Sequence, residues 1–407
     1  MTTTNGDGMK LRRLAGVALV SLLAALLISA CGAGSEPPAS SGPSSQTAAQ
    51  DTEWLEAAAQ VAAPGGEAAL AVEATRAMPA AGLANPRRIR DVIVFGDSLS
   101  DVGTYKVGVI AQVGGGKFTT NPGPVWAETI GLLLRARVTP YRQGFAGNSQ
   151  ILGGTGFAMG GARVSQQPGI GCNPDANGAC TAALTIPVAQ QVSDYLAAND
   201  DRFSREQLVF VLAGANDIFF QLGVFQAKVA DGVPVDVAGS AALAAVKQAA
   251  LELVGQVQRV IKRGATRVVV LNLPELTETP FGKATPAPVR SLIAGMVQTF
   301  NGMLAAGLNG TGARSLDFHA EFMRVIENPH AFLVREINVP ACDAAKIAAI
   351  TDGLEQGGSS LFCSRQTLLQ NGAALTYLFA DSVHPTTLGH LIVARFVLIG
   401  IWKQGLL

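Results

Sequence analysis

Charged residues are scarce in this sequence: they make up 15% of its 407 residues, and 30 Lys and Arg balance 30 Asp and Glu. No basic patch and no run of like charges occurs along the chain, which excludes a nucleic-acid-binding surface and a charged interaction tail. The hydrophobic content of 48% is too high for a disordered protein and is typical of a globular core. We therefore expect small-molecule or lipid partners and no nucleic acid.

Three common catalytic motifs are also missing. No serine lies in a G-x-S-x-G pentapeptide, so the nucleophile elbow of the α/β-hydrolases is absent. No H-E-x-x-H pattern or close cluster of His and carboxylates predicts a metal site. Gly154, Gly156 and Gly160 have the wrong spacing for a nucleotide-binding loop, and no clear strand precedes them. We expect neither a metal nor a cofactor.

Cysteine is rare, with five residues, of which Cys31 stands apart near the N-terminus. An even number of remaining cysteines predicts two disulfides in an oxidising compartment. Four cysteines allow three pairings, and we favour the pairing of nearest neighbours in the sequence. This pairing joins Cys172 to Cys180 and Cys342 to Cys363. The spacings of these cysteines are too wide for zinc ligands and no histidine is near, which argues against a zinc site.

The N-terminus has the pattern of an export signal. Lys10, Arg12 and Arg13 precede an uncharged apolar stretch over 14–30, which predicts a signal peptide over residues 1–30. The stretch ends in Ile-Ser-Ala before Cys31 and resembles the bacterial lipobox, which implies a lipidated Cys31 and a membrane partner. The following Gly32 favours sorting to the outer membrane, facing the periplasm or the cell surface. An uncleaved anchor and an ordinary cleavage site are the alternatives.

The rest of the chain divides into a linker and one domain. Residues 31–88 are rich in Gly, Ser, Pro and Ala, which predicts a flexible tether with one short helix near 52–61. Over 89–407, apolar β-branched runs alternate with amphipathic segments, which predicts an α/β domain with a parallel sheet of about five strands. The expected strands are 91–95, 207–212, 267–272, 314–318 and 377–379, and the expected helices are 124–134, 186–198, 241–262, 289–308 and 386–402.

Four short blocks carry the chemistry of this predicted domain. They are 96–101, 157–162, 213–217 and 381–385, and three of them directly follow predicted strands. Functional groups gather at the carboxyl ends of strands in open parallel sheets, so we expect the blocks to meet. Ser98 in the first block is a candidate nucleophile, and His384 is the natural base to take its proton. Asp381 lies three residues earlier and can orient the imidazole, as the acid of a Ser-His-Asp triad does.

The two middle blocks supply candidate donors for an oxyanion. The backbone N–H groups of Ser98 and Gly161 and the side-chain amide of Asn216 are the expected donors. A glycine suits the second position because a backbone donor there must approach the substrate without an intervening side chain. Each block is weak by itself, and their joint order along the chain predicts an acyl-transfer site.

These blocks resemble those of the GDSL family, also called the SGNH hydrolases, over about residues 91–390. The family's Ser, Gly, Asn and His correspond here to Ser98, Gly161, Asn216 and His384. The stretches 123–128 and 384–390 are similar to the branch that contains bacterial lipases, phospholipases and haemolysin-like esterases. Thr104 departs from the Asn that this branch often carries. The resemblance implies a flavodoxin-like three-layer sandwich and esterase activity without a cofactor.

The substrate class follows from weaker signals. Phe219 and Phe220 come soon after the third block and could line an acyl pocket, or they could belong to the core. The glycine-rich stretch 113–124 is interpreted as a mobile rim over the site or as a surface loop. These features favour an esterase or lipase for aliphatic or lipid esters. The alternatives are a polysaccharide O-acetylesterase and a lipoprotein that keeps the fold as a binding module without catalysis.

Overall fold

The computed structural model describes residues 89–407. The predicted signal peptide, the lipidation site Cys31, the linker over 31–88 and its short helix lie outside the described residues.

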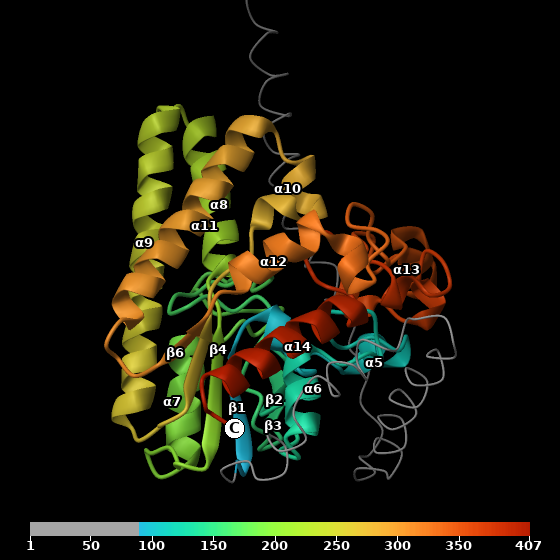
Figure 1. The fold of residues 1–407 in the computed structure, drawn as a ribbon. Coiled ribbons are helices and arrows are strands. Elements are labelled where there is room, and N and C mark those ends of the chain that lie inside the picture. Colours follow the sequence, from blue (N-terminus) through green and yellow to red (C-terminus); the bar gives the residue numbers. More distant parts are fainter. Residues whose placement is uncertain (1–88) are drawn as a thin grey trace, which may run out of the picture.

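A parallel sheet forms the centre of the domain (Figure 1). Its strands are β1 (Asp91–Gly96), β4 (Gln207–Leu212), β5 (Val268–Leu271) and β6 (Arg314–Leu316), in the order β1-β4-β5-β6. Residues of β4 and β5 are all buried, as expected of parallel strands that are covered on both faces. The sequence places continuous apolar runs at these positions, and burial on both sides explains why the runs do not alternate with polar residues.

Helices cover both faces of the sheet and complete a three-layer α/β sandwich (Figure 1). One layer contains α6 (Trp126–Leu133) and α14 (Thr387–Lys403), and the other contains α7 (Val188–Ala198), α9 (Val235–Lys262) and α11 (Ala287–Leu308). The fold class predicted from the sequence is therefore confirmed. Both α9 and α11 have the length and apolar composition of a membrane-spanning helix, but here they pack against each other and line the core.

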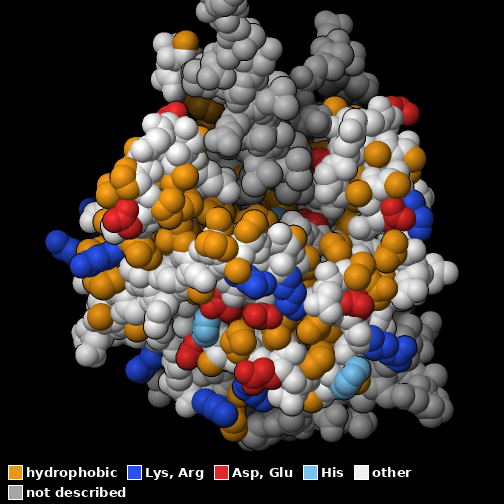
Figure 2. Space-filling model, turned by 90° about the horizontal axis from the view of Figure 1, so that it is seen from above, with side chains coloured by type: hydrophobic (Ala, Val, Ile, Leu, Met, Phe, Trp, Pro, Cys, Tyr) orange, Lys and Arg blue, Asp and Glu red, His pale blue; other side chains and the backbone are white. Residues whose placement is uncertain are grey.

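The remaining helices and one hairpin complete the described part of the fold. The helices are α5 (Gly108–Gln112), α8 (Ala215–Ala230), α10 (Pro280–Ala284), α12 (Phe318–Glu327) and α13 (Ala344–Ile350). A small antiparallel hairpin, β2 (Arg142–Phe145) with β3 (Asn148–Ile151), was not predicted. The upper parts of α8, α9 and α11 rise above the sheet, and apolar side chains gather on the face that they form (Figures 1 and 2). Val235 and Val237 in the first turn of α9 are among the exposed apolar residues.

The prediction of a strand at 377–379 is wrong, so the sheet has four strands where about five were expected. Tyr377 makes only an isolated bridge with Glu336, and Phe379 makes one with Pro385. The apolar character of this segment comes from packing, because Phe379 is buried and its ring lies 6.2 Å from that of Phe322 in α12. Helix α9 begins at Val235, six residues before the predicted start at 241, directly after its N-cap Pro234.

Both disulfides join the expected nearest neighbours. Cys172 pairs with Cys180, and Cys342 pairs with Cys363. The second bridge fixes the segment before α13 to the end of the 3-10 helix η4 (Ser360–Phe362), whose first residue, Ser360, donates its N–H to Asp381.

Candidate active site

The first block begins where β1 ends. Gly96 closes the strand, and a Cβ at this position would lie 2.2 Å from the carbonyl oxygen of Leu212 in β4, so only glycine fits. Ser98 then opens the 3-10 helix η1 (Ser98–Ser100), with Asp97 as its N-cap accepting from the backbone N–H of Leu99. This sharp turn brings the Ser98 hydroxyl to the carboxyl end of the sheet, where it lines a pocket.

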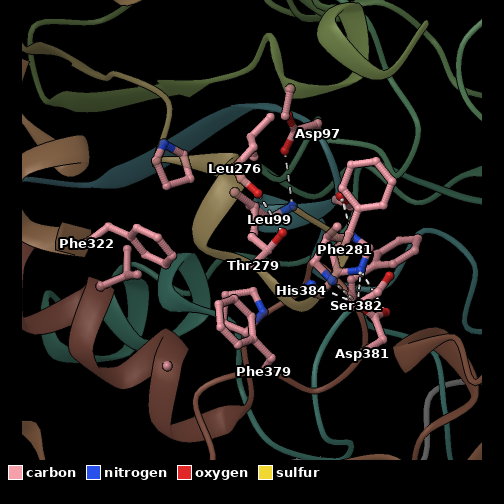
Figure 3. Close-up of a pocket in the computed structure, with 18 of the residues that line it drawn as sticks. Asp97, Leu99, Leu276, Thr279, Phe281, Phe322, Phe379, Asp381, Ser382 and His384 are labelled. Atoms are coloured by element: carbon pink, nitrogen blue, oxygen red, sulfur yellow. Dashed lines mark hydrogen bonds and ion pairs between the residues drawn. The ribbon is translucent and has the colours of Figure 1, made fainter. Parts of the chain in front are cut away.

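Ser98, His384 and Asp381 form one connected chain of hydrogen bonds. Figure 3 shows His384 and Asp381 side by side in the pocket. The Nε2 of His384 lies 2.8 Å from the Oγ of Ser98, and its Nδ1 lies 2.8 Å from the Oδ2 of Asp381. Ser98 and His384 are 286 positions apart in the sequence, and the fold brings both, together with Asp381, to one end of the sheet. The arrangement has the connectivity of a nucleophile, a base and an orienting acid.

Backbone groups hold the Asp381 carboxylate in place. Its Oδ1 accepts from the N–H groups of Val383 at 2.9 Å and His384 at 2.7 Å, and its Oδ2 accepts from the N–H of Ser360 at 2.9 Å. Burial by itself would raise the pKa of Asp381, but the nearby His384 and these hydrogen bonds lower that pKa below its usual range. The carboxylate therefore stays ionised and can fix the imidazole with its Nδ1–H toward Asp381.

A phenyl ring covers the imidazole. Phe118 lies with its ring centroid 4.9 Å from that of His384 and is itself buried. The glycine-rich stretch 113–124 that carries Phe118 was predicted to be a mobile rim over the site or a surface loop, and the surface loop is wrong for most of the stretch. Residues 115–121 are buried, and the side chain of Asn121 donates to the carbonyl oxygens of Lys117, Thr119 and Ser360. These bonds satisfy the loop's backbone internally, which allows it to lie inside the protein.

The three residues that carry the candidate oxyanion donors, Ser98, Gly161 and Asn216, line one pocket. Gly161 has a φ of +76°, and a Cβ there would lie 2.1 Å from the carbonyl oxygen of Ile170, so glycine is required for both reasons. Asn216 is the second residue of α8, just after β4, and its Nδ2 donates to the carbonyl oxygen of Ala162 at 2.9 Å. This bond uses one of the two amide hydrogens. Within residues 89–407, neither backbone N–H of Ser98 and Gly161 donates to a protein acceptor.

A buried ion pair joins the segment directly after the second block to the third block. The Nε of Arg163 lies 3.2 Å from the Oδ1 of Asp217, and the Oδ2 of Asp217 accepts from the N–H of Val164. Burial raises the pKa of Asp217, although Arg163 opposes this shift. The guanidinium also lies over the ring of Phe220 at 4.0 Å. Phe220 therefore packs against Arg163 and does not line the pocket, whereas Phe219 does.

Two further carboxyl groups support the first block. Asp101 is fully buried and accepts from the backbone N–H groups of Gly103, Thr104 and Gly160, which ties the first block to the second. Thr104 itself contributes its N–H to this network. Burial raises the pKa of Asp97 to about 7, and its Oδ2 has no partner among the described residues. Asp97 also lines the pocket next to Ser98.

Most of the pocket wall is apolar and comes from elements that sequence reasoning did not associate with the site. The ring of Phe281 in α10 packs edge-on against Phe219 at 5.4 Å. Phe318, Phe322 and Val325 of α12 lie at i, i+4 and i+7 and so share one face of that helix. Their spacing was visible in the sequence, but it equally predicts ordinary core packing. Other apolar lining residues are Leu99, Phe118, Ile170, Pro274, Leu276, Leu378, Phe379, Val383, Pro385, Ile392 and Val393.

The remaining histidines do not take part in the site. His390 is fully buried in α14, where its Nδ1 accepts from the backbone N–H of Trp126 at 3.3 Å. Burial lowers the pKa of His390 to about 3, so the side chain is neutral and serves in packing.

Among residues 89–407, no group of three His, Cys, Asp or Glu side chains is arranged to hold a metal ion.

Comparison with known proteins gives one match to a family. The model of the GDSL-like Lipase/Acylhydrolase family matches residues 92–397, which include all four blocks. No curated protein matches the chain.

Proposed function

The chain belongs to the GDSL-like lipase/acylhydrolase family, a family of ester and acyl hydrolases, and from this premise we propose that it is a serine esterase with Ser98 as nucleophile. The observation that carries the proposal is the position of His384, whose two ring nitrogens each lie 2.8 Å from an oxygen, one of Ser98 and one of Asp381. A serine hydroxyl is a poor nucleophile until a base takes its proton, and His384 Nε2 is within reach of that proton.

The reaction follows from these contacts. Ser98 Oγ attacks the ester carbonyl carbon while His384 Nε2 takes the hydroxyl proton, and Asp381 stabilises the resulting imidazolium. The N–H groups of Ser98 and Gly161 and the free amide hydrogen of Asn216 stabilise the oxyanion of the tetrahedral intermediate. His384 returns the proton to the leaving alcohol oxygen as the bond to the carbonyl carbon breaks. In the second half-reaction His384 Nε2 takes a proton from a water molecule as its oxygen attacks the acyl carbonyl carbon. The bond from that carbon to Ser98 Oγ then breaks, Ser98 Oγ regains a proton from His384, and the carboxylic acid is released.

Aliphatic or lipid esters are the proposed substrates, because apolar side chains form most of the wall around Ser98. A polysaccharide O-acetylesterase would use the same catalytic groups, but it would have no use for a long apolar wall. A binding module without catalysis would have no need for the full set of hydrogen-bonded groups at Ser98.

The direct test is hydrolysis of p-nitrophenyl esters from acetyl to decanoyl, with Ser98→Ala as the control. We expect hydrolysis by the wild-type protein and its loss in the variant. If no ester and no acetylated glycan is hydrolysed, the enzymatic proposal is wrong. If acetyl esters are preferred over longer ones and acetylated glycans are hydrolysed, the O-acetylesterase is favoured.

We also propose that the protein is an exported lipoprotein anchored through Cys31. Two disulfides support export, since such bonds persist mainly in oxidising compartments. The test is detergent phase partitioning of the full chain expressed in a bacterium. We expect Cys31→Ala to move the protein from the detergent phase to the aqueous phase, and unchanged partitioning would contradict lipidation.

A further inference from the structure

The pocket at Ser98 has a half-exposed end and a buried end. Phe281, Ser382 and His384 lie on one side of the close-up, and Phe322 lies on the other, with Leu276, Thr279 and Phe379 between them (Figure 3). Around the first end, Phe219, Phe281 and Val383 are partly exposed. The pocket therefore continues from the nucleophile into the interior.

The buried end lies between α12 and α14. Phe322 is 8% exposed and Val325 is 2% exposed on α12, and Val393 is 6% exposed on α14, yet all three line the pocket. Because these lining residues have so little contact with solvent, this end of the pocket lies in the interior of the protein. A buried apolar end of this kind suits an aliphatic chain and disfavours a sugar or a charged group.

One acidic residue, Glu321, lines this end of the pocket, which is otherwise apolar. The Oε2 of Glu321 forms an ion pair with Arg324, whose side chain is 65% exposed. The charge of Glu321 is therefore compensated by a group at the surface. The other side chains that α12 and α14 contribute to the wall are hydrocarbon, and they are Phe318, Phe322, Val325, Ile392 and Val393.

We propose that this buried end binds the acyl chain of the ester, and that the walls formed by α12 and α14 set the length of chain that the enzyme accepts. The inference rests on the proposed function, since it assigns the substrate of the same site. It differs from the sequence prediction, which offered Phe219 and Phe220 either as the lining of an acyl pocket or as core residues. Phe219 belongs to the half-exposed end, and Phe220 packs against Arg163 outside the pocket.

The order of the two reaction steps at Ser98 indicates which part of the ester, the acyl chain or the alcohol, occupies the buried end. The acyl group stays attached to Ser98 after the first step, whereas the alcohol must leave before water can attack. The residues of α12 and α14 at the buried end are at most 8% exposed, whereas Phe219, Phe281 and Val383 at the other end are partly exposed and border the route to solvent. The alcohol therefore leaves through the half-exposed end, and the acyl chain occupies the buried end.

Chain-length profiling measures this directly. We expect kcat/KM of the wild-type protein for p-nitrophenyl esters to rise roughly tenfold or more from acetyl to octanoyl, because each methylene buried from water adds binding energy. A series from ethyl acetate to octyl acetate lengthens the alcohol instead. We expect its kcat/KM to change little along the series, since the alcohol lies toward solvent.

Val393→Phe adds a ring to the wall of the cavity, and Val257→Phe is the matched control. Val257 is fully buried in α9 and does not line the pocket. We expect Val393→Phe to lower the octanoyl-to-acetyl ratio of kcat/KM at least tenfold and to leave the octyl-to-ethyl acetate ratio unchanged. Val257→Phe should leave both ratios unchanged. Thermal unfolding gives a second readout: Val257→Phe overpacks a filled core and should lower Tm by several degrees, whereas Val393→Phe enters empty space and should not.

The outcomes separate this inference from the proposed function. A wild-type protein that hydrolyses esters without preference for longer acyl chains would overturn the inference and leave the esterase intact. An unchanged octanoyl-to-acetyl ratio in Val393→Phe would also overturn it, as would an effect confined to the alkyl acetates. Failure to hydrolyse any ester would overturn the proposed function, and the inference with it.

Discussion

Replacing Asp381 with asparagine changes one oxygen of the site and should disable the base. In the structure Oδ1 of Asp381 accepts from two backbone N–H groups, of Val383 and His384, so the oxygen of an asparagine amide should stay at that position. The new NH2 group then faces the N–H of Ser360 and the Nδ1 of His384, where Oδ2 now lies. An NH2 group can only donate, so it forces the imidazole into the tautomer that carries its hydrogen on Nε2. That nitrogen lies 2.8 Å from Ser98 Oγ and can no longer take its proton.

The magnitude follows from the loss of a correctly oriented base. We expect Asp381→Asn to lower kcat by about 1,000- to 10,000-fold, the effect of the equivalent change in a Ser-His-Asp triad. That loss corresponds to about 4–5 kcal/mol of transition-state stabilisation. The lost hydrogen bond from Ser360 should also lower the free energy of unfolding by about 1–3 kcal/mol.

Rapid-mixing kinetics with p-nitrophenyl butyrate measures the acylation rate separately from binding. The acylation rate should fall while KM changes by less than about threefold, because Asp381 acts on the transition state through His384. Asp343→Asn is the control, since Asp343 caps α13 and does not line the pocket. A loss of less than tenfold in Asp381→Asn would refute the role assigned to this carboxylate.

Three other perturbations have expected outcomes. Asn216→Ala removes one oxyanion donor and should lower kcat roughly 100- to 1000-fold; a loss below about threefold would exclude that role. Burial raises the pKa of Asp97 to about 7, so the folded state keeps a proton that the unfolded state loses above about pH 4. Stability should therefore fall as the pH rises from about 4 to 7, and Asp97→Asn should flatten this dependence of Tm; an unchanged slope would contradict the account. Replacing Cys342 and Cys363 with serine should lower the free energy of unfolding in urea by about 3 kcal/mol, and no loss would show that the bridge does not constrain the chain.

Much of the fold could be predicted because burial in a parallel sheet leaves a local signature. The apolar run at 207–212 coincides with β4, and the predicted helix over 289–308 differs from α11 only at its first turn. The same logic extends to part of the site, because the first and third blocks directly follow strands. Ser98 comes after β1 and Asn216 comes after β4, and these strands are neighbours in the sheet.

Features that depend on contacts between distant segments could not be predicted. The apolar segment 377–379 has the composition of a strand, yet tertiary packing against α12 explains its burial without pairing in the sheet. Helical periodicity in 318–325 shows which face of α12 is apolar, but not that this face borders a cavity shared with α14. The position of Phe118 over His384 depends on hydrogen bonds from Asn121 within a buried loop, and no local sequence pattern predicts such a loop.

Ser98 is proposed as the acyl-accepting nucleophile that His384 activates. Intact-mass and peptide analysis after reaction with a fluorophosphonate tests it most directly, because the probe forms a stable adduct only with an activated serine. We expect one adduct per chain, located on Ser98, and its loss in His384→Ala. An adduct on another residue, or unchanged labelling of Ser98 in His384→Ala, would contradict this proposal.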